Sequence, residues 1–127
     1  MIATNLEQSE RLIKAGIDPS TADMCYTNSS VKGTDYTDEF ELVPKTSEEV
    51  RAIYNEAYHE WDKHWKIIPS WSLSALLDVF DDKEGLAKDY GLWFCYDNGK
   101  SHCTKHYTNP IDACYEMIIW LKENKYI

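Results

Sequence analysis

Residues 92–123, LWFCYDNGKSHCTKHYTNPIDACYEMIIWLKE, carry the main fold signal, because they join a predicted β-hairpin to a predicted long helix. Residues 92–97 are aromatic and favour a strand, and Asn98-Gly99 is the pair that two-residue hairpin turns prefer. Residues 100–107 then form the returning strand. A hairpin followed by a helix that is apolar on several sides predicts an α+β domain.

The helix in this segment has clear start signals. Asn109 is a suitable N-cap, Pro110 fits the first helical position, and Asp112 places a negative charge near the positive helix end. The helix is expected to end at about Glu123. Apolar residues on more than one side predict that it is the central helix of the core. These residues are Ile111, Cys114, Tyr115, Met117, Ile118, Ile119, Trp120 and Leu121.

The two-residue turn fixes the register of the hairpin. It predicts three opposing pairs, namely Asp97 with Lys100, Cys95 with His102, and Trp93 with Thr104. In this register Cys95, His102 and His106 share one face, and Cys103 points to the other. Three such ligands with an open position would suit a catalytic zinc ion, although no supporting carboxylate can be placed. A half-buried cysteine with surface histidines is the simpler interpretation, and no cofactor is predicted.

Ser72 begins another predicted helix before the hairpin. With Ser72 as N-cap, Trp71 and Leu76 occupy the positions of a hydrophobic staple. The buried face of this helix is predicted to consist of Leu73, Leu76, Leu77 and Phe80. Residues 81–91 are charged and end in glycine, so an irregular turn or a frayed continuation of the helix is expected there.

A third helix is predicted near the N-terminus, over residues 5–15. Thr4 and Glu7 form its expected capping box, and Gly16 supplies its left-handed stop. Asp18-Pro19 then starts a short helical turn, with the aspartate as cap.

The next segment predicts a second hairpin and a fourth helix. Strands are expected over residues 24–28 and 40–43, joined by a loop rich in small and polar residues over 29–39. A capping box and a long apolar stripe predict a helix over about residues 47–66. The predicted fold is therefore one α+β domain over residues 1–127, in which about four helices pack on a small antiparallel sheet from two hairpins.

Net charge limits the class of partner. The chain has 22 acidic and 13 basic residues among 127, for a formal charge of −9. Nucleic acids and anionic membranes are bound through Lys and Arg, so neither is expected as a partner. Residues 92–127 hold four acidic and four basic residues, and the acidic excess therefore lies in residues 1–91. This excess can attract a basic protein, or it can serve only as a solubilising surface.

Cysteine spacing and the N-terminus indicate the compartment. Cys25, Cys95, Cys103 and Cys114 show no C-x-x-C spacing, and the longest apolar run, Met117–Leu121, is far too short to span a membrane. The first residues lack the basic and apolar pattern of a secretion signal. Four free thiols in the cytoplasm, or in a packaged virion, are expected, and two disulfides are the alternative.

Two groups of residues are candidates for a binding surface. The first is acidic and contains Asp81 and Asp82, which lie in a run without the ligand order of a calcium loop. The second is aromatic, because aromatic side chains anchor protein interfaces and stack on sugars. The aromatic residues predicted on strands or loops are Tyr26, Tyr36, Trp93, Tyr96 and Tyr107.

Three strings carry a resemblance to a known group of proteins. They are NLEQS at 5–9 leading to STADM at 20–24, PSWSLSALL at 69–77, and NPIDA at 109–113 running to Trp120-Leu121. In these strings the chain resembles a family of small bacterial proteins, often encoded in phage or other mobile-element neighbourhoods, with no established activity. The resemblance implies shared caps and buried residues, and it assigns specificity to the hairpins between them.

These observations lead to three hypotheses of function. The preferred one is a non-enzymatic acidic protein-interaction module, such as an inhibitor, an adaptor, or an accessory protein of a virion or mobile element. The second is a small enzyme or metal-binding protein that uses Cys95, His102 and His106. The third is a carbohydrate-binding module that uses exposed aromatic rings. Enzyme chemistry is disfavoured because the sequence has no G-x-S-x-G motif and no glycine-rich phosphate loop.

Overall fold

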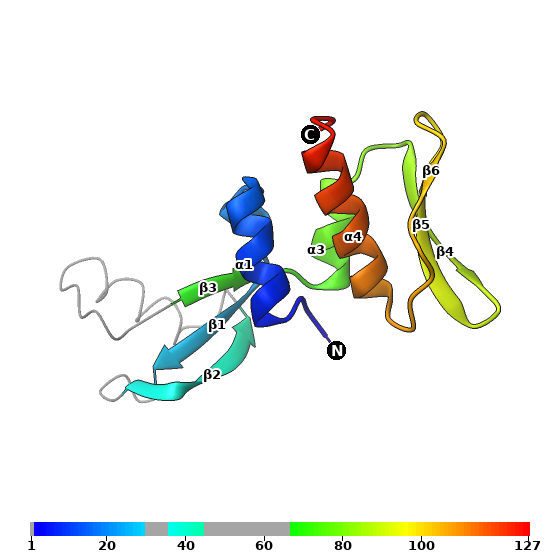
Figure 1. The fold of residues 1–127 in the computed structure, drawn as a ribbon. Helices are drawn as coiled ribbons and strands as arrows, with labels where there is room; N and C mark the ends of the chain where they lie inside the picture. The colour runs from blue at the N-terminus through cyan, green and yellow to red at the C-terminus, as the bar shows by residue number, and fades with distance from the viewer. Residues whose placement is uncertain (1, 30–35, 45–66) are drawn as a thin grey trace.

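The computed structural model describes residues 2–29, 36–44 and 67–127 (Figure 1). The elements in chain order are α1 (Leu6–Ala15), the 3₁₀ turn η1 (Pro19–Thr21), β1 (Met24–Ser29), β2 (Tyr36–Pro44), β3 (Ile67–Ser70), α3 (Leu73–Val79), β4 (Glu84–Asp89), β5 (Leu92–Asp97), β6 (His102–Cys103) and α4 (Pro110–Glu123). The predicted α+β class is confirmed. The helix predicted over residues 47–66 lies outside the described residues.

The described strands form two antiparallel three-stranded sheets, and not the single sheet that was predicted. Strand order is β2-β1-β3 in the first sheet and β4-β5-β6 in the second. In Figure 1 the two sheets are well separated, and α3 and α4 lie between them. Two strands that the pattern did not predict, β3 and β4, each extend one predicted hairpin. The described ranges hold three α-helices, where about four were expected for the whole chain.

The first sheet confirms the N-terminal hairpin, although β2 begins at Tyr36, inside the stretch that was predicted to be a loop. Strands β1 and β2 pair antiparallel, with Cys25 opposite Val43. Strand β3 joins the other side of β1 and places Pro69 opposite Cys25. Since proline has no backbone N–H, it is tolerated in a sheet mainly on an edge strand, which is where β3 lies.

The cap of α1 differs from the prediction by one residue. Asn5, not Thr4, is the N-cap, and it forms the capping box with Gln8 in place of Glu7. The Gln8 N–H donates to Asn5 Oδ1 at 2.8 Å, and the Asn5 N–H donates to Gln8 Oε1 at 3.1 Å. Gly16 ends the helix in the left-handed conformation, with φ of 95°, as predicted.

Thr4 is instead the centre of a buried hydroxyl cluster. Its Oγ1 lies 2.8 Å from Ser9 Oγ and 3.1 Å from Ser70 Oγ, and accepts the Trp71 N–H at 3.1 Å. The Tyr26 hydroxyl donates to the Thr4 carbonyl at 2.9 Å. Buried polar groups need hydrogen-bond partners, so Thr4 is placed where these groups can reach it and not at the helix cap. The cluster joins the N-terminal segment to the first sheet.

Helix α3 begins at the predicted cap. Ser72 accepts the Ala75 N–H through its side chain, and Trp71 and Leu76 are both fully buried in the core. The expected buried face was partly wrong, because Leu77 is 38% exposed and Ala75 is buried. Four of the seven residues of the helix lie in the core or pack against it, namely Leu73, Ala75, Leu76 and Val79.

Residues 84–89 form strand β4, and the expected irregular turn or frayed helix was wrong. The strand pairs with β5 from Glu84 opposite Asp97 to Asp89 opposite Leu92. Alternate residues of the strand face the core, and Leu86 packs against it. The charged residues of the strand made this alternation hard to recognise in the sequence. The turn between β4 and β5 contains two residues, Tyr90 and Gly91, and both have positive φ.

The loop between β5 and β6 has four residues, where a two-residue turn was predicted. Asp97 lies opposite His102, two positions from its predicted partner Lys100, and Trp93 lies opposite Tyr107, three positions from its predicted partner Thr104. The cause is the buried Asp97 carboxylate, whose Oδ1 accepts the Lys100 N–H at 2.8 Å. To make this bond, residues 98–101 loop around the carboxylate before the chain enters β6. A shift of two positions leaves each side chain on its predicted face as far as Cys103.

Helix α4 is the central helix, as predicted. The Asn109 side chain caps it by accepting the Ile111 N–H at 2.8 Å. Eight of its residues are buried, and it contacts α1, α3, β4 and β5. None of the described helices is long and apolar enough to cross a membrane.

Candidate functional site

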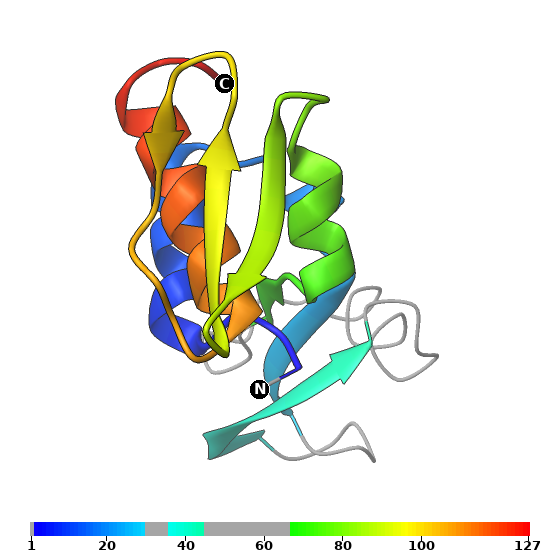
Figure 2. The same ribbon diagram turned by 90° about the vertical axis from the view of Figure 1, so that its right-hand side faces the viewer.

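The two faces of the second sheet have different surroundings. On the inner face, Cys95 Sγ lies 3.7 Å from Cys114 Sγ of α4, and both residues are fully buried. Figure 2 looks onto the outer face, with α4 behind the sheet and no described element in front of it. Because residues alternate between faces along a strand, Phe94 and Tyr96 of β5 belong to this outer face.

Three rings follow one another along the outer face, and we call them the open aromatic face: Phe94, Tyr96 and His106. The Phe94 ring centroid lies 6.3 Å from that of Tyr96 and 4.8 Å from that of His106. Phe94 and Tyr96 are only half-buried, and His106 is exposed. Aromatic rings grouped on an uncovered sheet face are typical of a surface that binds another molecule.

Gly85 of β4 allows Tyr96 to lie across this face. A Cβ atom at position 85 would lie 2.4 Å from Tyr96 Oη, which is closer than real atoms approach. Any other residue at this position would move the ring. The exposed Cys103 lies opposite Tyr96 on β6 and borders the same surface.

The structure does not bring together the three hypothetical metal ligands. Trp93 forms a bridge with Tyr107, so His106 falls on the outer face and not beside Cys95, as the predicted register had it. The His102 ring stacks on Trp120 of α4 at 3.7 Å between centroids. A hydrogen bond with Cys114 and burial raise the pKa of Cys95. Among the described residues, no group of three His, Cys, Asp or Glu side chains could hold a metal ion.

The predicted aromatic residues lie in different places. Trp93 and Tyr107 pack against the core on the inner side, and Lys88 Nζ lies 5.2 Å from the Trp93 ring. Tyr26 belongs to the hydroxyl cluster, and burial raises its pKa. Tyr36 is part of β2, and its side chain lies outside the described structure. Of the five predicted residues, Tyr96 alone is found on the open aromatic face.

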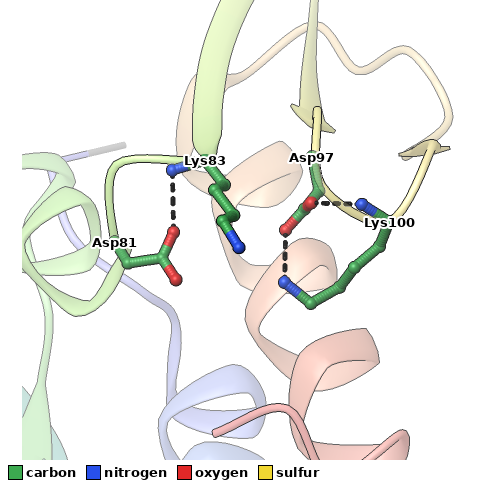
Figure 3. Close-up of polar contacts among 4 residues, drawn as sticks. All are labelled: Asp81, Lys83, Asp97 and Lys100. Carbon is green, nitrogen blue, oxygen red and sulfur yellow. Dashed lines mark hydrogen bonds and ion pairs between the residues drawn. The ribbon is translucent and has the colours of Figure 1, made fainter.

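A cluster of charged residues lies at the end of the second sheet near the β5–β6 loop (Figure 3). Asp81 is exposed, and its Oδ1 accepts the Lys83 N–H at 2.7 Å. Asp97 has a fully buried side chain and accepts the Lys100 Nζ at 3.0 Å. Burial raises the pKa of Asp97, but the hydrogen bonds from Lys100 outweigh burial and lower the pKa overall. Asp82 is exposed beside these residues.

Glu84 is the strained member of this cluster, because it lies directly opposite Asp97 in the β4–β5 pairing. Burial raises the pKa of Glu84, and a hydrogen bond with Asp81 raises it further. The same hydrogen bond lowers the pKa of Asp81. The folded protein therefore disfavours the ionised form of Glu84 relative to its ionisation in the unfolded chain.

Glu84→Gln is expected to raise the melting temperature at about pH 7, because the folded environment disfavours the negative charge of the half-buried Glu84. A raised carboxyl pKa stabilises the fold below the unfolded-state pKa, and this contribution is lost as the pH rises through the folded-state pKa. The gain should therefore shrink toward about pH 4. Thermal unfolding followed by circular dichroism at several pH values measures it. Glu10→Gln is the control, because Glu10 is exposed on α1. A lower melting temperature for Glu84→Gln than for the parent at neutral pH would contradict the raised pKa of Glu84.

Several features of this surface were missed in the sequence. Phe94 and His106 were not proposed as contact residues, and the turn at Tyr90-Gly91 was not recognised. Side chains alternate between the two faces along residues 92–97, so Phe94 faces the opposite side from Trp93 and Cys95. This alternation was the signal that could have placed Phe94 on the outer face. Gly91 between two strand-length segments was the available signal for the turn.

Comparison of the chain with protein-family models, with curated proteins and with solved structures finds no match. The geometry of the second sheet is therefore the main guide to function.

Proposed function

We propose that this protein is a non-enzymatic interaction module that binds a protein partner through the open aromatic face. The observation that carries the proposal is the asymmetry of the second sheet. Its inner face is filled by α4, while Phe94, Tyr96 and His106 line an outer face that no described element covers. Aromatic residues are enriched among the residues that supply most of the binding energy of protein interfaces.

The charge of the chain supports a basic partner. A net charge of −9 attracts a cationic protein over a long range and repels polyanions. Asp89, at the end of the open aromatic face, is half-exposed and lies 3.9 Å from His106. Asp81 and Asp82 add further exposed carboxylates at the other end of β4. The module would act as an inhibitor, an adaptor or an accessory protein in a mobile-element setting, in the cytoplasm or a virion.

The metal, enzyme and sugar hypotheses receive less support. Cys95, His102 and His106 point to different surroundings, and the Trp93 ring contacts the core and lies beneath Lys88. Cys95, His102 and His106 therefore form no shared ligand position, and the Trp93 ring is not free to stack on a sugar.

The first experiment uses Cys103, the exposed thiol on the outer face. The purified protein is labelled at Cys103 with a benzophenone-maleimide and irradiated in a lysate of the cells that produce it. We expect a discrete covalent adduct with one protein, identified by mass spectrometry. The matched control is a Cys103→Ser, Leu77→Cys variant, which carries the label on the exposed side of α3. Equal adducts from both positions, or no adduct from Cys103, would refute binding at the open aromatic face.

Phe94→Ser is expected to weaken binding of the captured partner by about tenfold or more, equivalent to about 1.4 kcal/mol. The ring is half-buried, so the loss of folding stability should remain near 1 kcal/mol. Titration calorimetry with the recombinant partner measures the first quantity, and urea unfolding measures the second. Leu77→Ser controls for removal of an exposed apolar side chain elsewhere. Unchanged affinity for Phe94→Ser would contradict the proposed surface.

A further inference from the structure

Tyr90 occupies the tip of the β4–β5 hairpin. It is 97% exposed, so its ring makes almost no contact with the rest of the described protein. The turn contains only Tyr90 and Gly91, because Asp89 and Leu92 on either side are already paired. Both turn residues have positive φ, 49° and 79°.

The conformation of Tyr90 is unfavourable for its residue type. Positive φ at both central positions is the requirement of a type I′ turn, for which Asn-Gly is the preferred pair. A residue with a bulky side chain is strained in this region, and only glycine, asparagine or aspartate adopts it readily. Tyr90 therefore costs conformational energy and exposes a large ring to water. The ring makes almost no contact within the described protein that would offset this conformational energy.

A strained residue that makes no stabilising contact within its own fold is a candidate for a role in binding another molecule. We propose that Tyr90 is an anchor residue, which inserts its ring into an apolar pocket on the protein partner. This inference rests on the proposed function, because Tyr90 lies at the end of the sheet whose outer face carries the open aromatic face. A tight two-residue turn on a paired hairpin fixes the backbone at Tyr90 before binding, which reduces the backbone entropy lost on association.

The surroundings of Tyr90 indicate the chemistry of that pocket. The neighbouring Asp89 has a side chain that is 54% exposed, close to His106. A lysine or arginine at the rim of an apolar pocket would pair with this carboxylate as the ring enters. A second copy of this chain is a poor candidate, because two molecules of charge −9 repel each other. The partner is therefore a basic protein with an aromatic-accepting pocket.

Tyr90→Asn separates folding from binding. Asparagine suits the turn, so this variant should have a higher melting temperature than the parent. It should also bind the partner captured through Cys103 at least about thirtyfold more weakly, as loss of an interface anchor does. Tyr90→Phe keeps the ring and should retain most of the affinity. Calorimetry with the recombinant partner and thermal unfolding of each variant give both quantities.

The outcomes distinguish the anchor from the function on which it rests. Adducts at Cys103 that persist with Tyr90→Asn, together with unchanged affinity, would overturn the anchor and leave the open aromatic face as the binding surface. No adduct even with Tyr90 present would overturn both. A lower melting temperature for Tyr90→Asn would refute the claim of strain. Mapping the cross-linked partner peptide to a surface without Lys or Arg would refute the basic rim.

Discussion

Trp71→Ala is expected to lower the free energy of unfolding by about 3–5 kcal/mol, the range for removal of a large buried aromatic side chain. Trp71 is fully buried between β3 and α3. Its Nε1 donates to Thr21 Oγ1 at 2.9 Å, and its carbonyl accepts the Thr4 N–H at 2.8 Å. Removing the ring would leave a cavity where the first sheet meets the helices. Urea unfolding followed by circular dichroism gives the value.

Leu77→Ala is the matched control for Trp71→Ala. Leu77 lies in the neighbouring helix α3 but is 38% exposed, so its truncation should cost less than about 1 kcal/mol. Similar losses for the two variants would mean that Trp71 does not fill the core as described. Trp71→Phe should lose less than Trp71→Ala, because most of the apolar area remains and only the Thr21 hydrogen bond is removed.

Asp97→Ala is expected to lower the free energy of unfolding by about 2–4 kcal/mol, because it removes a buried group with several hydrogen bonds. The Asp97 carboxylate accepts the backbone N–H and the side-chain Nζ of Lys100. Without it, these donors lose their acceptor, and the four-residue loop loses the group around which it folds. Denaturant unfolding measures the loss, with exposed Asp82→Ala as the control. A change for Asp97→Ala as small as that of the control would contradict this role.

The lowered pKa of Asp97 also predicts the direction of its pH dependence. A carboxyl group with a depressed folded-state pKa stabilises the fold above its unfolded-state pKa, and this contribution is lost as the pH falls through the folded-state pKa. The difference in free energy of unfolding between the parent and Asp97→Asn should therefore be smallest at acid pH. The effect of Glu84→Gln should have the opposite sign and should also be smallest in acid, because its stabilising effect grows toward neutral pH. The two variants together therefore test the charges of this cluster.

Local signals in the sequence predicted the helices of the described part well. The left-handed Gly16, the Ser72 cap and the Asn109-Pro110 start depend on a few neighbouring residues, and each is confirmed. The one-residue error at the start of α1 has a tertiary cause. Thr4 is a good cap by residue type, but Ser70, which is distant in the sequence, shares its hydroxyl interactions.

The second sheet was harder to predict because its shape depends on distant or buried groups. Strand β4 carries three charged residues, Glu84, Lys88 and Asp89, and follows Lys83. These charges masked the alternation around Leu86. Asn98-Gly99 is a favourable two-residue turn, but burial of Asp97 favours a longer loop. Propensity is a weak signal when a buried charge must be satisfied.

The candidate surface could be predicted only in part. Tyr96 was proposed as a contact residue and lies on the open aromatic face. Which face of the hairpin stays open depends on where α4 packs, and no local pattern specifies that. Tyr90 was missed because tyrosine is atypical for the turn position that it occupies.

The proline in β3 has a consequence for concentrated solutions. Pro69 lies opposite Cys25 in an edge strand of the described sheet, and it has no backbone N–H to donate. Proline in an edge strand disfavours pairing with a strand of a neighbouring molecule, and so disfavours the edge-to-edge growth that leads to fibrils.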